Sequence, residues 1–132
     1  MLTFFVEGKA AAQGSKKHVG RGVMVEMSKD LPVWRKAVTE AARDAHQGRP
    51  AIDGPVSVAL TVYVAKPKST RFKAYPAGPA DLDKYQRAVG DSLEKARVIT
   101  NDSRIVHWDP WKRWADEHTP PGALITITEL ED

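Results

Sequence analysis

The sequence contains no cysteine, which excludes disulfide bonds and thiolate metal ligands. Its four histidines do not have the spacing of metal ligands, so no zinc site is expected. The chain also lacks a long apolar run. Its apolar N-terminal stretch covers a few residues and is too short for a signal peptide or a membrane span. We therefore expect a cytoplasmic protein with no membrane partner.

Repeats and low-complexity tracts are absent as well, and 132 residues favour a single domain that buries most of its apolar surface. The formal net charge is a modest +3, which a dimer would double. A mildly basic balance favours a polyanionic partner without identifying one. The positions of the charges are more informative than their sum.

Acidic residues are missing from residues 8–22, which carry four glycines and five basic side chains: Lys9, Lys16, Lys17, His18 and Arg21. Because glycine lets a backbone approach a ligand closely, this stretch fits a flexible basic arm that contacts phosphates, with Lys16, Lys17 and Arg21 as the candidate contacts. An ordinary surface loop is the alternative. The stretch is not a P-loop, since the pattern G-x-x-x-x-G-K-[ST] is absent.

A second stretch without acidic residues covers residues 66–75 and contains two aromatic residues. Its four basic side chains are Lys66, Lys68, Arg71 and Lys73. Cations here would hold a polyanion beside the acidic residues that follow in the sequence, as phosphodiester cleavage requires. A solvated run of charges is the alternative interpretation.

Alternating apolar residues predict strands at four places: residues 2–7, 23–27, 55–65 and 123–130. A helix is expected to begin at Ser28 or Asp30, with Pro32 in its first turn, and to stop at residues 47–50. Its apolar positions favour packing against the sheet.

The most informative stretch is residues 79–106. Asp81 and Asp83 open a helical pattern whose apolar residues are spaced by three and four, and Asp81 is placed to cap this helix. After the helix, Asp102 lies in a turn before a short strand over residues 104–108. If that strand returns beside the start of the helix, three carboxylates gather into a site for a hard divalent cation such as Mg²⁺.

The same residues permit a simpler interpretation. Four charged residues of alternating sign follow one another at intervals of four: Asp83, Arg87, Asp91 and Lys95. Such a ladder is typical of a solvated helix face with weak ion pairs. Because D-x-D is a short and common string, its spacing alone does not distinguish a metal site from ion pairs.

The order of the motifs is more specific. The chain resembles the RusA family of Holliday junction resolvases in the order of four features. These are a D-x-D motif, a basic residue four positions after its second Asp, a helix with D-x-L, and an acidic turn before a strand. The matching residues are Asp81, Asp83, Arg87, Asp91-Ser92-Leu93 and residues 102–106. The likeness is strongest over residues 79–106 and extends more loosely to both ends of the chain.

The resemblance implies one RusA-like domain over residues 1–132, forming a homodimer that cleaves four-way DNA junctions in recombination and repair. It implies one or two Mg²⁺ ions per site, with Mn²⁺ as a substitute, held by Asp81, Asp83 and Asp102, and no small-molecule cofactor. Arg87 stands at the position of the family's catalytic lysine. Together with the element pattern, the resemblance predicts an α+β fold: a mixed sheet of about four or five strands covered by two helices.

The residues expected to contact DNA come from both basic stretches and from the helix that follows: Lys16, Lys17, Arg21, Lys66, Lys68, Arg71, Lys73 and Lys84. Three positions depart from the family pattern. Lys84 stands where the family usually has Asn, Arg87 where it has Lys, and Asn101 where it has the first Asp of a pair. A non-catalytic DNA-binding or packaging module on the same fold is therefore an alternative function, as is a nuclease for other branched DNA.

Three of the four tryptophans, Trp108, Trp111 and Trp114, fall within seven residues. They are expected either to pack against the sheet or a dimer partner, or to stack on unpaired bases of a junction.

Overall fold

The computed structural model describes residues 1–14, 16–18, 24–26, 29–78 and 80–132. Four strands form the main sheet: β1 (Leu2–Glu7), β4 (Val56–Val64), β5 (Ile105–Trp114) and β6 (Gly122–Glu129). Two short strands pair separately: β2 (Lys16–His18) and β3 (Met24–Glu26). The helices are α1 (Leu31–His46) and α2 (Leu82–Lys95), and a 3₁₀ turn, η1 (Asp102–Arg104), precedes β5.

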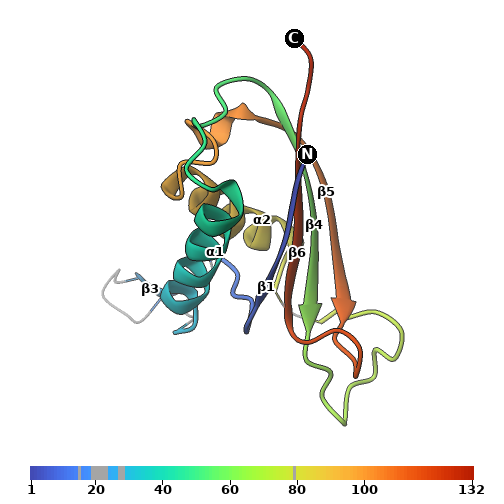
Figure 1. Ribbon diagram of the computed structural model, residues 1–132. Coiled ribbons are helices and arrows are strands. Elements are labelled where there is room, and N and C mark those ends of the chain that lie inside the picture. Colours follow the sequence, from blue (N-terminus) through green and yellow to red (C-terminus); the bar gives the residue numbers. More distant parts are fainter. Residues whose placement is uncertain (15, 19–23, 27–28, 79) are drawn as a thin grey trace.

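The main sheet is mixed and has the strand order β1-β6-β4-β5. Strands β4 and β5 are parallel, whereas the other neighbours are antiparallel. Both helices lie on one face of the sheet (Figure 1). The predicted α+β fold, with a mixed sheet of four strands and two covering helices, is confirmed.

The core lies between this sheet and the helices. In β4, an inner strand, alternate residues are at most 1% exposed: Val56, Val58, Leu60 and Val62. They share one apolar cluster with Trp34 and Val38 of α1 and with Val89 and Leu93 of α2. Burying each side chain of this size contributes about 1.5–3 kcal/mol, so the period-two pattern of β4 is what fixes which face the helices cover.

Helix α2 connects the two parallel strands. Parallel neighbours cannot be joined by a tight hairpin, so the chain leaves β4, returns along α2 and enters β5 in the direction of β4 (Figure 1). The buried residues Tyr85, Val89 and Leu93, spaced by four, turn one face of α2 toward the sheet. The opposite face remains available for polar residues.

Strand β5 is longer than the sequence pattern indicates, since it continues beyond residue 108 to Trp114. It contains Pro110, which an edge strand such as β5 accommodates. Trp108 and Trp114 pair in register with Val58 and Val64, which places them on the helix-covered face. Trp114 Nε1 donates a hydrogen bond of 2.9 Å to the Phe72 carbonyl oxygen.

Trp111 behaves differently. It pairs with Thr61 on the opposite face of the sheet and is 48% exposed. The guanidinium of Arg113 lies 5.0 Å from the centre of its ring. Two of the three clustered tryptophans therefore lie on the helix side of the sheet, as the packing interpretation expects, and one is largely open to solvent.

Candidate active site

A pocket of about 510 Å³ is lined by α2, by the segment that enters β5 and by Gln13. Three of its lining residues are acidic: Asp83, Asp91 and Asp102. Arg87 and Gln86 of α2 also line it. Of the four catalytic residues predicted from the sequence, the pocket therefore brings together Asp83, Arg87 and Asp102.

The turn before β5 and the start of β5 lie against α2 at Gly90. A Cβ atom at Gly90 would be 3.6 Å from Trp108 Cζ2, 3.7 Å from Ile105 Cδ1 and 4.0 Å from Asp102 Cβ. Strand β5 thus begins beside the middle of α2 and not beside its first turn. As a result, Asp102 becomes a neighbour of Asp91 instead of Asp81.

The pKa of Asp102 is raised. The largest cause is partial desolvation of its carboxyl group, although much of the side chain is exposed, and the next is repulsion from the carboxylates of Glu94 and Asp91. A hydrogen bond between the Asp91 and Asp102 carboxyl groups also favours the protonated form. Neighbouring carboxylates that repel each other in this way favour the binding of a cation.

Asp91 is the site residue that the sequence analysis missed. Its Oδ2 atom accepts a hydrogen bond of 2.5 Å from Gln13 Nε2 and lies 3.9 Å from Arg35 Nη2. Gln13 is itself anchored on α2, since its backbone N–H donates to the Lys84 carbonyl oxygen at 2.9 Å. The available signal was the D-x-L motif, whose aspartate lies two helical turns after Asp83 on the charged face.

Arg87 Nη2 lies 3.8 Å from Asp83 Oδ2, and both side chains are 61% exposed. The backbone passes close to Arg87 at Gly14, where an added Cβ atom would be 3.0 Å from Nη1. The first pair of the expected charge ladder therefore forms. Asp91, the next acidic residue of that ladder, instead contacts Gln13 and Arg35.

Asp81 occupies the N-cap position of α2, as predicted, but its side chain makes no capping hydrogen bond. Its carboxylate lies 3.6 Å from Lys84 Nζ. Within the described residues, no three His, Cys, Asp or Glu side chains are close enough to hold a metal ion together. Helix geometry explains this, because the eight residues from Asp83 to Asp91 correspond to a rise of about 12 Å.

A family model for endodeoxyribonuclease RusA matches residues 7–128, nearly the whole chain. The chain belongs to the RusA family. Its members are endodeoxyribonucleases that act on branched DNA junctions, which makes this protein a member of a family of nuclease hydrolases. The resemblance carried by residues 79–106 is thereby confirmed. A search of curated proteins returned no match.

The basic loop of this RusA-family chain lies between β4 and α2, at one end of the sheet (Figure 1). Lys68, Arg71 and Lys73 are exposed there, and Arg71 lies over the Phe72 ring at 4.7 Å from its centre. Lys66 Nζ donates a hydrogen bond of 2.7 Å to the Lys73 carbonyl oxygen, which closes the loop.

Other predicted DNA contacts are less defined. Lys16 and Lys17 belong to strand β2, and Arg21 lies outside the described residues. Their contacts with DNA stay a prediction, as do those of Lys84.

None of the helices in the described ranges is long and apolar enough to cross a membrane.

The turn that carries Asp102 is fastened at both sides by Asp53. Asp53 Oδ1 accepts hydrogen bonds of 2.6 Å from Thr100 Oγ1 and 3.0 Å from Arg104 Nη2. The pKa of Asp53 is lowered, first by the hydrogen bond from Thr100, then by the hydrogen bond and the positive charge of Arg104. An ionised Asp53 therefore helps to hold Asp102 against α2.

We predict that Asp53→Asn lowers the melting temperature modestly near pH 7. The pKa of Asp53 in the folded protein lies below the unfolded value of 3.8, so its ionised carboxylate stabilises the protein at pH values above 3.8. This stabilisation is lost as the pH falls through the folded pKa. The difference from wild type should therefore shrink below about pH 4. Thermal denaturation across a pH series measures it, with the exposed Asp44→Asn as control; a difference that is constant with pH would contradict the electrostatic explanation.

Proposed function

We propose that this RusA-family protein is a Mg²⁺-dependent endodeoxyribonuclease that resolves four-way (Holliday) junctions by hydrolysing a phosphodiester bond in each of two opposed strands. The observation that supports this most directly is the pocket that brings three carboxylates and Arg87 together on a chain of an endodeoxyribonuclease family.

Asp91 and Asp102 suit a Mg²⁺ ion, because this cation takes oxygen ligands and is commonly held by one or two carboxylates together with waters. A cation between them would offset the repulsion from Glu94 and Asp91 that, after desolvation, raises the pKa of Asp102. Gln13 Oε1 is buried on the same pocket wall and has no hydrogen-bond partner in the described part of the chain. Because this oxygen is buried, it would accept a hydrogen bond from a metal-bound water only after the Gln13 side chain moves.

We therefore assign Asp91 and Asp102 as the main ligands and Asp83 to the other end of the pocket. When bound, the metal would lower the pKa of a coordinated water and neutralise charge on the reacting phosphate. Asp81 takes part only if bound DNA or metal draws its carboxylate away from Lys84.

The protein's own contribution is orientation. Gln13 and Arg35 fix the Asp91 carboxylate, while the Glu94 carboxylate accepts a hydrogen bond of 2.8 Å from the Asp102 backbone N–H. These contacts hold the two carboxylates side by side before substrate arrives. Such preorganisation matters because small displacements of reacting groups cost large factors in rate.

Arg87 has an electrostatic role in this proposal. A guanidinium stays protonated at any working pH and cannot serve as a general acid or base. Its ion pair with Asp83 is exposed and therefore weak. The guanidinium is thus free to donate hydrogen bonds to the non-bridging phosphate oxygens as negative charge grows on them.

The exposed basic loop would contact the phosphates of the same substrate. Lys68, Arg71 and Lys73 project from it with no acidic residue in the segment, so its field attracts a polyanion toward the start of α2. Additional phosphate contacts are proposed for five further basic residues: Lys16, Lys17, Arg21, Lys66 and Lys84.

A non-catalytic DNA-binding module is the second candidate function. It is favoured by the finding that, among the described residues, no three carboxylates converge tightly enough for a metal. Incubating the purified protein with a labelled synthetic four-way junction, with and without Mg²⁺, separates the two candidates. A panel of forks, flaps and duplexes separates junction resolution from cleavage of other branched DNA.

We also propose that the protein is a homodimer that uses the uncovered face of the sheet. Leu124 pairs with both Phe5 and Thr61, and Thr61 pairs with Trp111, so these side chains form a row across that face. Phe5, Leu124 and Trp111 are 37%, 38% and 48% exposed. A second copy packed on this row would cover them and supply the second cutting site that paired cleavage needs.

The first prediction from this proposal is that Asp91→Asn and Asp102→Asn each lower single-turnover junction cleavage on the order of a hundredfold or more, by loss of a metal ligand. Junction binding in the presence of a chelator should persist or tighten, because repulsion toward phosphate is removed. Mn²⁺ or Mg²⁺ should raise the melting temperature of wild type and raise it less in the variants.

The exposed Asp44→Asn serves as the control for these carboxylate variants, and Asp81→Asn measured alongside reports whether Asp81 joins the site. Normal cutting by both Asp91→Asn and Asp102→Asn would contradict the assignment of the pocket.

The second prediction concerns Arg87. Arg87→Lys should retain much of the activity, whereas Arg87→Ala should lose on the order of a hundredfold in single-turnover rate, the usual effect of removing one donor to a developing negative charge. Affinity for the junction and melting temperature should change little. A rate loss that follows a fall in stability would instead assign Arg87 a structural role through its pair with Asp83.

The third prediction is that sedimentation equilibrium at micromolar concentration finds a dimer, and that Trp111→Glu combined with Leu124→Glu gives a folded monomer. Val33→Glu, at an exposed apolar residue of α1, is the matched control and should leave the dimer intact. A wild-type monomer would refute the dimer, and a dimeric double variant would place the interface elsewhere.

A further inference from the structure

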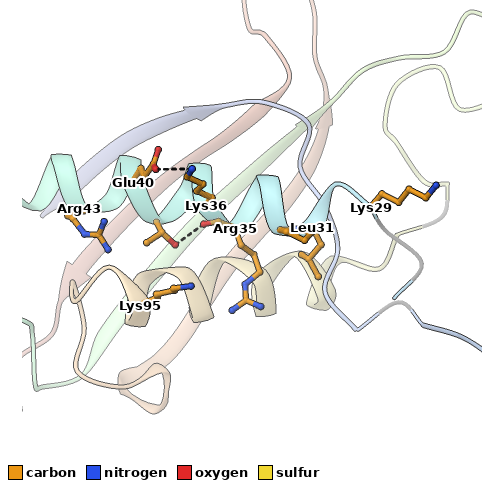
Figure 2. Close-up of a pocket in the computed structure, with 9 residues that line it drawn as sticks. Lys29, Leu31, Arg35, Lys36, Glu40, Arg43 and Lys95 are labelled. Atoms are coloured by element: carbon orange, nitrogen blue, oxygen red, sulfur yellow. Dashed lines mark hydrogen bonds and ion pairs between the residues drawn. The ribbon is translucent and has the colours of Figure 1, made fainter. Parts of the chain in front are cut away.

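A second pocket, of about 620 Å³, runs along α1 and reaches the C-terminal end of α2 (Figure 2). Five of its lining residues are basic: Lys29, Arg35, Lys36, Arg43 and Lys95. Glu40 is the acidic residue among the described ones that line it. The sequence analysis named none of these five basic residues as a DNA contact, and it placed Lys95 only in the charge ladder of α2. We call this surface the α1–α2 groove.

The helical spacing explains why the cations gather here. Residues at intervals of four form one row along α1: Leu31, Arg35, Thr39 and Arg43. Figure 2 shows Arg35 and Arg43 extending from this row toward α2, from which Lys95 projects.

The floor of the groove is closed by polar contacts. Thr39 is 5% exposed and its Oγ1 donates a hydrogen bond of 2.7 Å to the Arg35 carbonyl oxygen. Ser92 of α2 donates to the same oxygen at 3.4 Å. The helices therefore meet at this row, and the charged ends of the side chains stand at the rim.

These cations are weakly compensated. Lys36 Nζ lies 3.9 Å from Glu40 Oε1, but the two side chains are 77% and 57% exposed, and such surface pairs contribute little. Lys29, Arg43 and Lys95 are exposed. A concave surface with five positive charges and one negative charge concentrates an electrostatic field that attracts a polyanion.

The groove adjoins the candidate active site through one ion pair. Arg35 lines the groove, and its Nη2 atom is 3.9 Å from Oδ2 of Asp91, which lines the carboxylate pocket. A strand whose phosphate lies at the carboxylates can therefore continue past Arg35 onto the basic groove along α1.

We propose that the α1–α2 groove binds the phosphodiester backbone of the DNA arm that leads away from the cutting site. The identity of the polyanion rests on the proposed nuclease function. The contacts would be to phosphates and not to bases, because the rim offers flexible cations and no described aromatic residue for stacking. The groove would thus add affinity without sequence preference.

Fluorescence anisotropy with a labelled four-way junction and a labelled duplex, in chelator and at several KCl concentrations, tests this. Arg43→Gln combined with Lys95→Gln should weaken binding on the order of tenfold. Each lost phosphate contact should also lower the slope of log affinity against log salt by about one. Glu40→Gln should tighten binding, a gain that misfolding does not produce.

Arg43→Gln alone has a matched control in Arg49→Gln, an exposed arginine just beyond α1 that does not line the groove. The basic-loop variant Lys68→Gln with Arg71→Gln, run alongside, measures the contribution of that loop. Equal effects of Arg43→Gln and Arg49→Gln, or unchanged salt slopes in the groove variants, would overturn the proposal, as would failure of wild type to bind DNA at low salt.

Cleavage assays in Mg²⁺ separate this proposal from the function itself. If wild type cuts junctions while the groove variants bind them normally, the groove proposal is wrong and the nuclease assignment stands. If wild type does not cut any branched substrate but the groove variants lose DNA binding, the groove is supported and the nuclease proposal fails.

Discussion

The contact between Gly90 and the beginning of β5 is the constraint on which the candidate site depends. The β4–α2–β5 crossover fixes the direction of β5, and around Gly90 the side chains of Trp108, Ile105 and Asp102 lie at van der Waals distance from the middle of the helix. This contact decides which helical residue faces Asp102. The Asp53 clamp on Thr100 and Arg104 then holds the turn in place.

Helix α2 borders three different environments: the apolar core, the carboxylate pocket and the basic groove. Its apolar face packs on the sheet, its acidic face lines the carboxylate pocket, and Lys95 at its C-terminal end joins the basic groove of α1. Negative charge is therefore concentrated where a metal is proposed to bind, with positive charge next to it. A nuclease needs this arrangement, because carboxylates alone would repel the phosphates that must reach them.

Local pattern was sufficient for most of the fold. Strand β1 lies where alternation predicts it, β4, β6 and both helices agree within a few residues, and the order of motifs identified the family. Prediction from the local pattern failed where contacts between residues far apart in the sequence determine the structure. The extension of β5 depends on parallel pairing with β4, which stabilises a strand containing Pro110, and the pairing of Asp102 with Asp91 depends on where β5 docks along α2. Neither is encoded by spacing along the chain.

The Arg35–Asp91 pair connects the two charged surfaces, and its energetics argue for coupling between them. In the free protein Arg35 lies beside Asp91 and partly offsets its charge. A phosphate in the groove and a cation at Asp91 would each weaken this pair, the first by attracting the guanidinium and the second by repelling it. If both proposals hold, DNA in the groove makes Asp91 a better metal ligand, and the metal makes Arg35 a better phosphate ligand, because linkage between two binding sites is reciprocal.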